Sequence, residues 1–177
     1  MEAVMTEKQF LVLVSAMKAV YSSEKFLPDE DAAKVWYKFL CDIDYKTLSM
    51  AVQRHMMTSQ FPPTIADLRK NAAPEIDQMS DLAAWALVRQ AISNSSYHAE
   101  EEYRKLPPLI QKAIGNPANL REMASMDVAT VNSVEQSNFL RVYRATVTRE
   151  KELLQLSPSM RELIGSTEKT MLGAKEE

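Results

Sequence analysis

The stretch SQFPPTIADLRKN, residues 59–71, places two adjacent prolines between segments with helical patterns. Proline is excluded from the interior of a helix because it lacks an N–H group and its ring clashes with the preceding turn. Pro62 also moves Phe61 away from helical backbone angles. Thr64 can cap a new helix, with Asp67 three positions later as the second half of a capping box. The stretch therefore predicts a sharp boundary between two helices.

The same helical patterning extends over most of the chain, because apolar residues recur at steps of three and four. The segments concerned are residues 6–21, 28–41, 44–58, 64–70, 80–92, 99–106, 108–114, 117–124, 131–156 and 158–165. No segment has a convincing strand pattern, and the best β candidate, DVATVNSV, is short and isolated. Only 3 glycines occur, which argues against turn-rich β architectures. We predict an all-α fold: an N-terminal four-helix bundle, then a second helical segment with one long helix.

The helical periods also predict which residues of the bundle face its core. These are Phe10, Leu13, Val14, Met17, Val20, Tyr21, Ala32, Val35, Trp36, Phe39, Leu40, Leu48, Val52, Ile65 and Leu68. In the second segment, SNSSYH (residues 93–98) is typical of a loop between two helices.

Composition shifts suggest four parts of the chain. We predict an N-terminal helical domain over residues 1–72, a linker over 73–79, and a C-terminal helical domain over 80–156. Residues 157–177 are expected to form a short helix and a flexible tail.

The charge balance does not favour nucleic acid as the main partner. The chain carries a net charge of −3, with residues 1–72 neutral. A protein whose main partner is DNA or RNA usually carries a strong excess of positive charge. The N-terminal apolar run stops after 8 residues, which is too short for a membrane span. We therefore expect no membrane association and only weak direct DNA binding.

No motif for catalysis, metal or cofactor binding is found in the sequence. There is no phosphate-binding loop, and one cysteine with two histidines cannot form a standard Cys/His zinc site. Cys41 is expected to be a small buried residue that ends a helix. His55 is expected at the core edge or surface, and His98 in a loop beside an acidic run. We predict no catalytic residue, no metal, no cofactor and no enzymatic activity.

Two groups of residues are candidates for partner binding. Arg141, Arg144 and Lys151 share one side of the long helix, either as a solvated face or as a contact for an acidic partner or DNA. The last short helix carries Met160, Leu163 and Ile164 on one face, which could lie in a partner groove.

The methionines leave a similar choice open. Several of the 11 methionines lie near helix ends or connections, where the thioether either fills core gaps or lines adaptable binding surfaces. They are Met56, Met57, Met79, Met123, Met126, Met160 and Met171.

Four pieces of the N-terminal segment occur together in one order: the opening helix, then VWYKFL, DYKTLSMAVQRH and FPPTIADLRK. With these pieces, residues 6–70 resemble the N-terminal domain of the phage replicative-helicase loader/inhibitor proteins of Gram-positive phages and prophages. The residues that carry this signature are Tyr21, Trp36, Phe61, Pro62, Pro63, Thr64 and Asp67. AWALVRQAI, LPPLIQKAIG, NLREMA and SNFLRVYRATVTREKE resemble the downstream region of related phage replication proteins.

The resemblance implies a non-enzymatic adaptor in the cytoplasm of a bacterial host. Such proteins bind a hexameric replicative DNA helicase, hold it inactive and help to deliver it to an origin-bound initiator protein. Their C-terminal part can be flexible and engage the helicase, whereas residues 80–156 here are patterned as folded helices. The alternative is a small all-α phage DNA-binding regulatory protein. In that case the helix after Pro62 would be a recognition helix with Arg69 and Lys70.

Overall fold

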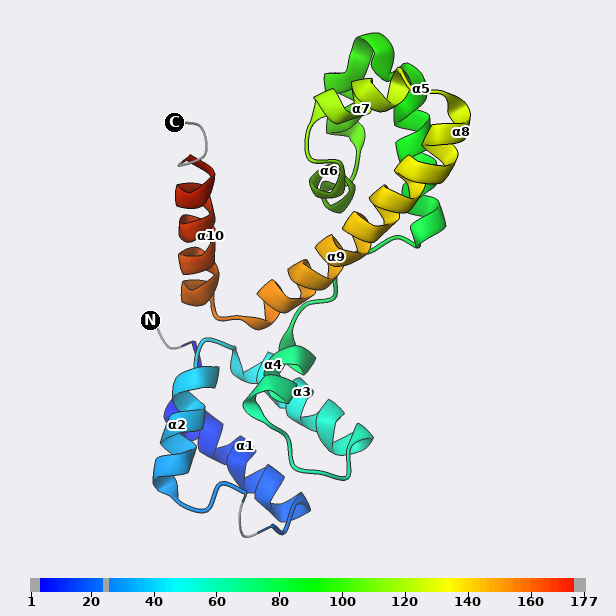
Figure 1. The fold of residues 1–177 in the computed structure, drawn as a ribbon. Helices are drawn as coiled ribbons and strands as arrows, with labels where there is room; N and C mark the ends of the chain where they lie inside the picture. Colours follow the sequence, from blue (N-terminus) through cyan, green and yellow to red (C-terminus); the bar gives the residue numbers. More distant parts are fainter. Residues whose placement is uncertain (1–3, 24–25, 174–177) are drawn as a thin grey trace. The chain divides into compact units, whose positions relative to one another are not determined.

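The computed structural model describes residues 4–23 and 26–173, with side chains up to residue 167. Within these residues every regular element is a helix and none is a strand, so the all-α prediction is confirmed (Figure 1). The chain divides into two compact units. Unit 1 consists of residues 1–74 and 152–177, and unit 2 consists of residues 75–151.

Four short helices form the N-terminal part of unit 1. They are α1 (Glu7–Val20), α2 (Glu30–Leu40), α3 (Tyr45–Thr58) and α4 (Ile65–Ala72). Isolated helices of this length are marginal in water, so tertiary packing must hold them. Phe10, Leu48 and Leu68 are completely buried in one shared core. Complete burial of such a side chain stabilises the fold by about 1.5–3 kcal/mol.

Three residues expected in this core lie outside it. Val20, Val35 and Phe39 are each more than half exposed. Helix α2 instead buries Ala33 and Leu40, with half-buried Trp36 and Tyr37 between them. These four residues follow the spacing i, i+3, i+4, i+7. Because α2 carries apolar residues on two adjacent faces, its periodicity alone does not decide which face is buried.

The boundary at the proline pair is built as predicted. The backbone N–H of Thr64 donates to Asp67 Oδ2 at 2.9 Å, and the N–H of Asp67 donates to Thr64 Oγ1 at 3.1 Å. This reciprocal capping box starts α4. Pro63 is buried, whereas the ring of Phe61 is 68% exposed.

Two core side chains fix the approach to the proline pair. The hydroxyl of Tyr21 donates to the carbonyl oxygen of Ser59 at 3.0 Å. His55 Nε2 lies 3.0 Å from the carbonyl oxygen of Phe61, at hydrogen-bond distance. These contacts anchor the loop at the end of α3, so Tyr21 serves both packing and loop anchoring.

The signature tryptophan has a packing role. The ring of Trp36 lies edge-on against Phe26, with centroids 5.7 Å apart. Phe26 in turn contacts Tyr21 edge-on at 6.2 Å. Such edge-to-face pairs add about 0.5–1.5 kcal/mol beyond their buried area. Trp36 and Tyr21 are thus connected through one aromatic cluster at the edge of the core.

Unit 2 consists of one long helix, several short ones and the start of α9. The elements are α5 (Asp81–Lys105), α6 (Pro108–Ile114), α7 (Pro117–Ala124), α8 (Val128–Thr130), a π-helix over Val131–Glu135 and α9 (Gln136–Gln155). α6 begins after Pro107 and ends at Gly115, whose φ of 92° lies in the region that favours glycine. Trp85, Phe139 and Tyr143 pack ring against ring in the core of unit 2.

The prediction of a loop over residues 93–98 is wrong, because α5 is helical through these residues. Ser93 Oγ donates to the carbonyl oxygen of Arg89, and Ser95 Oγ donates to that of Ala91. These bonds satisfy the hydroxyl groups within the helix, so serines that usually favour loops are tolerated. A kink does occur at His98, where φ is −122° and ψ is 31°.

The last helix is longer than expected. α10 runs over Pro158–Gly173 rather than ending at Gly165. Ser157 precedes it, and its Oγ lies 3.4 Å from the N–H of Met160, as expected for an N-cap. The frayed tail predicted over residues 166–177 is wrong for residues 166–173, which belong to α10, and residues 174–177 lie outside the described part of the chain.

Candidate functional site

The predicted basic stripe lies on α9 within unit 2, but its middle residue is engaged. Arg144 Nε donates to Asp81 Oδ2 at 2.7 Å. Because Asp81 is the first residue of α5, this ion pair ties α9 to the start of that helix. Arg141 and Lys151 are exposed. Arg144 therefore ties two helices of unit 2 together although its side chain is 65% exposed, and Arg141 and Lys151 are in no ion pair found among the described residues.

The predicted apolar group lies on α10 in unit 1. Met160 is 48% exposed and Leu163 is 62% exposed, while Ile164 is half-buried. None of the three belongs to either hydrophobic core. The i, i+3, i+4 spacing places them on one side of the helix. α10 thus presents an apolar side that the folding of unit 1 does not use.

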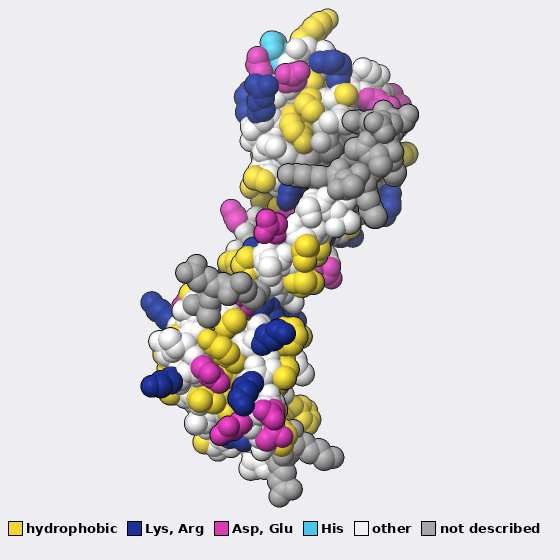
Figure 2. Space-filling model, turned by 90° about the vertical axis from the view of Figure 1, so that its left-hand side faces the viewer, with side chains coloured by type: hydrophobic (Ala, Val, Ile, Leu, Met, Phe, Trp, Pro, Cys, Tyr) yellow, Lys and Arg dark blue, Asp and Glu magenta, His cyan; other side chains and the backbone are white. Residues whose placement is uncertain are grey.

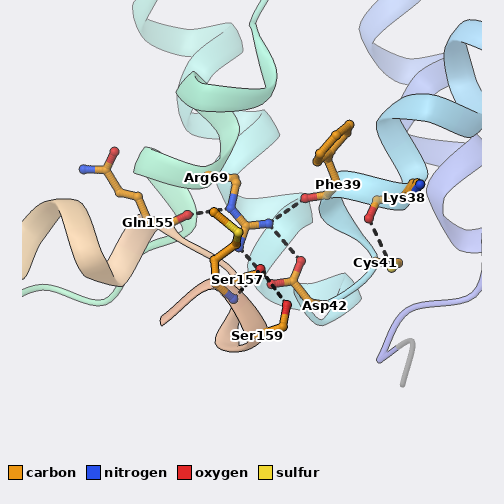
Figure 3. A network of polar contacts seen from close by, with 9 residues as sticks. Lys38, Phe39, Cys41, Asp42, Arg69, Gln155, Ser157 and Ser159 are labelled. Atoms are coloured by element: carbon orange, nitrogen blue, oxygen red, sulfur yellow. Dashed lines mark hydrogen bonds and ion pairs between the residues drawn. The ribbon is translucent and has the colours of Figure 1, made fainter. Parts of the chain in front are cut away.

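Among the described residues of unit 1, Arg69 on α4 lies at the centre of a network of polar contacts (Figure 3). Its guanidinium forms two hydrogen bonds of 2.8 Å to the carboxylate of Asp42, which follows α2. It also donates to the carbonyl oxygen of Phe39 at 2.6 Å and to that of Gln155 at 2.5 Å. The side chains of Arg69 and Asp42 are only 15% and 8% exposed. The pair is therefore largely withdrawn from water.

The Arg69 network holds the residues that lead into α10. Gln155 ends α9, and Ser157 caps α10 two residues later. A small hollow of about 200 Å³ lies beside the network and is also lined by Asp44 and Arg161. Asp44 already accepts a hydrogen bond from the N–H of Thr47 as the N-cap of α3. The network can thus position α10, and its acidic groups are already paired or capping.

The sequence pattern does not predict this network. It presents Arg69 only as a possible DNA contact and does not single out Asp42. The two residues are 27 positions apart, and no local spacing rule connects them. The available signal was an arginine on the short, amphipathic helix α4, whose other face is buried.

The remaining titratable candidates have structural roles. Cys41 is buried at the end of α2, as predicted. His55 is 8% exposed and anchors the loop at Phe61. His98 lies inside α5 rather than in a loop, 3.6 Å from Glu101. Among the described residues, no group of three or more His, Cys, Asp or Glu side chains is placed to hold a metal ion.

The surface carries mixed charge. On the face drawn in Figure 2, the described lysine and arginine side chains of each unit lie among acidic and hydrophobic ones. Within the described residues, no helix combines the length and apolar character required to span a bilayer.

The first four helices of the chain thus form a small, all-helical fold around one shared core. Residues 5–69 match the family model for the N-terminal domain of a phage helicase loader/inhibitor protein. This match confirms the resemblance of the N-terminal segment to the phage helicase loader family. A search of curated proteins and a search of solved structures gave no match.

Proposed function

We propose that the protein is a non-enzymatic adaptor of phage DNA replication. It binds a hexameric replicative DNA helicase, holds it inactive and helps to load it at the origin through an initiator protein, in the cytoplasm of the bacterial host. The match of residues 5–69 to the helicase loader domain carries this proposal. It needs no cofactor of its own, because an adaptor acts by occupying its partner.

The apolar side of α10 supports the proposal by offering a contact. Met160, Leu163 and Ile164 are exposed or half-buried and belong to neither core. An amphipathic helix that lays such a side into a hydrophobic groove is a recurring mode of recognition. α10 is therefore the first helicase contact that we propose, and Arg141 and Lys151 in unit 2 are separate exposed charges for an acidic partner.

The bonding of Arg69 argues against the alternative of a DNA-binding regulator. A recognition helix at α4 would need Arg69 and Lys70 at its surface to reach bases or phosphates. Arg69 instead donates all of its described hydrogen bonds to Asp42, Phe39 and Gln155. Exposed Lys70 is then the one basic group that α4 offers to DNA.

Co-migration with a helicase is the direct test. The protein would be mixed at micromolar concentration with a bacterial replicative helicase and ATP, and the mixture separated by size. A complex that contains both proteins is expected, with lower helicase ATPase and unwinding rates than for the helicase alone. Addition of initiator-coated origin DNA should then restore unwinding. Separate migration of the two proteins would contradict the proposal, and retardation of bare DNA at low salt would favour the regulator.

A further inference from the structure

A π-helix interrupts the chain between α8 and α9 in unit 2. It covers Val131–Glu135. π-helical turns are rare and frequently occur at functional sites. Two of its residues, Val131 and Asn132, line an open hollow of about 230 Å³ whose other walls come from α5, α7, α8 and the turn between α7 and α8. This hollow is unrelated to the Arg69 network, which lies in unit 1.

The lining of the hollow is mixed, with apolar side chains beside Arg89, Ser93, Ser96 and Asn132. Val131 is buried, Ile92, Met123 and Met126 are half-buried, and Val128 is 71% exposed. Methionine is unbranched and polarisable, so it adjusts its shape to different apolar partners. The hollow is smaller than the ~300–1,000 Å³ typical of small-molecule sites. It therefore suits one or two side chains of a protein helix better than a cofactor.

One charged side chain, Arg89, lines the hollow. It is exposed, and no ion pair of Arg89 is found among the described residues. The other lining residues include no acid. A guanidinium group bonds a carboxylate with two parallel hydrogen bonds, and such charge-assisted pairs are stronger than neutral ones. The charge of the hollow is thus complementary to an acidic side chain beside apolar ones.

We propose that this hollow is a second docking site for the replicative helicase. It takes a helix of the helicase that inserts apolar side chains among Met123, Met126 and Val128 and presents a carboxylate to Arg89. The inference rests on the proposed function and adds to it a surface in unit 2, outside the segment that matches the helicase loader domain. If one contact lies on each unit, the adaptor binds the helicase through two linked sites, and the overall affinity can exceed that of either site alone.

The test compares variants of the full chain for affinity to the helicase hexamer with ATP. Val128→Asp places a charge in the hollow, and Arg89→Glu reverses the charge beside it. Each is expected to weaken binding by about tenfold or more, because central contacts dominate interface affinity. The matched controls are Leu82→Asp, another exposed residue in the first turn of a helix of unit 2, and Arg121→Glu on α7. Both controls should bind within about twofold of the unmodified protein.

A photocrosslinker at Ser96, which is exposed and lines the hollow, identifies the occupant. The crosslinked peptide is expected to come from a helicase segment with apolar residues and an Asp or Glu within one turn. If the unmodified protein binds the helicase but the hollow variants bind equally well, or the crosslink joins two copies of this chain, the docking site is wrong and the proposed function stands. If the unmodified protein fails to bind any helicase, both proposals fall.

Discussion

The guanidinium of Arg69 and the carboxylate of Asp42 are joined by two hydrogen bonds of 2.8 Å, in a site where both side chains are largely buried. The pair links α4 to the turn after α2, and the third guanidinium nitrogen bonds the end of α9 at Gln155. Arginine fits this role because its planar fork serves a carboxylate and backbone carbonyl groups at once. The residue that a DNA-binding regulator would need at its surface is thus a structural tie of unit 1.

Removal of the arginine should destabilise unit 1. Arg69→Ala leaves Asp42 buried without its partner, and loss of one member of a buried ion pair costs about 3 kcal/mol or more. The measurement is urea unfolding followed by circular dichroism. Lys70→Ala, one residue away on the exposed side of α4, is the control and should change the unfolding free energy by less than about 0.5 kcal/mol. An Arg69→Ala protein with unchanged stability would show that the tie is not formed in solution.

The proline pair should act on stability and not on partner binding. Replacement of Pro62 and Pro63 by alanine gives the unfolded chain more freedom, at about 0.4–1 kcal/mol for each proline. Thermal melting should therefore shift downward, while affinity for the helicase below the melting range stays unchanged. If melting were unchanged and binding disappeared, the stretch at Phe61 would be a contact site rather than a helix boundary.

The predictability of this fold depends on how local each feature is. Helix starts such as Thr64 with Asp67 are confirmed because a capping box uses residues three apart, and such spacing is visible in the sequence. The burial of Phe39 was predicted wrongly because the choice between two apolar faces of α2 depends on which neighbours pack there. The serine-rich stretch in the middle of α5 was predicted as a loop because serine usually favours loops. In the structure, the hydroxyl groups of Ser93 and Ser95 donate to carbonyl oxygens of the same helix, so the helix continues.

In the candidate sites, too, features that depend on local spacing could be predicted and contacts between distant residues could not. The exposed apolar side of α10 follows from its spacing, so it could be expected in advance. The ion pairs Arg144–Asp81 and Arg69–Asp42 could not be expected from the sequence, because each joins residues far apart in the chain. The hollow beside the π-helix likewise depends on α5 and α7 meeting in space. Of this hollow, the sequence indicates only Met123 and Met126, as methionines that either fill core gaps or line a binding surface.

Stability should fall in acid because of the capping carboxylates. Hydrogen bonds from the hydroxyl group and the backbone N–H of Thr64 hold the pKa of Asp67 below its usual value. A lowered folded-state pKa means that this stabilisation is fully present above the unfolded pKa of about 3.9 and is lost as pH falls through the folded pKa. Urea midpoints measured from pH 6 to pH 2 should therefore drop below about pH 4.

Asp67→Asn is the matched variant for this pH dependence, because asparagine keeps the shape but does not ionise. It should be less stable than the unmodified protein at pH 6, and the gap should narrow as pH falls through the folded pKa of Asp67. Asp44, whose pKa is lowered in the same way by Thr47, remains as an internal reference in both proteins. An equal acid loss in both proteins would contradict a contribution from Asp67.

The apolar side of α10 should matter for binding and not for folding. Leu163→Asp places a charge on a side chain that is 62% exposed and outside both cores, so the unfolding free energy should change by less than about 0.5 kcal/mol. If α10 lies in a groove of the helicase, the same variant should weaken binding about tenfold or more, because a buried charge without a partner is costly. Glu162→Ala, on the opposite side of the same helix, controls for any effect of changing α10. Weakening by Glu162→Ala but not by Leu163→Asp would place the contact on the polar side of α10.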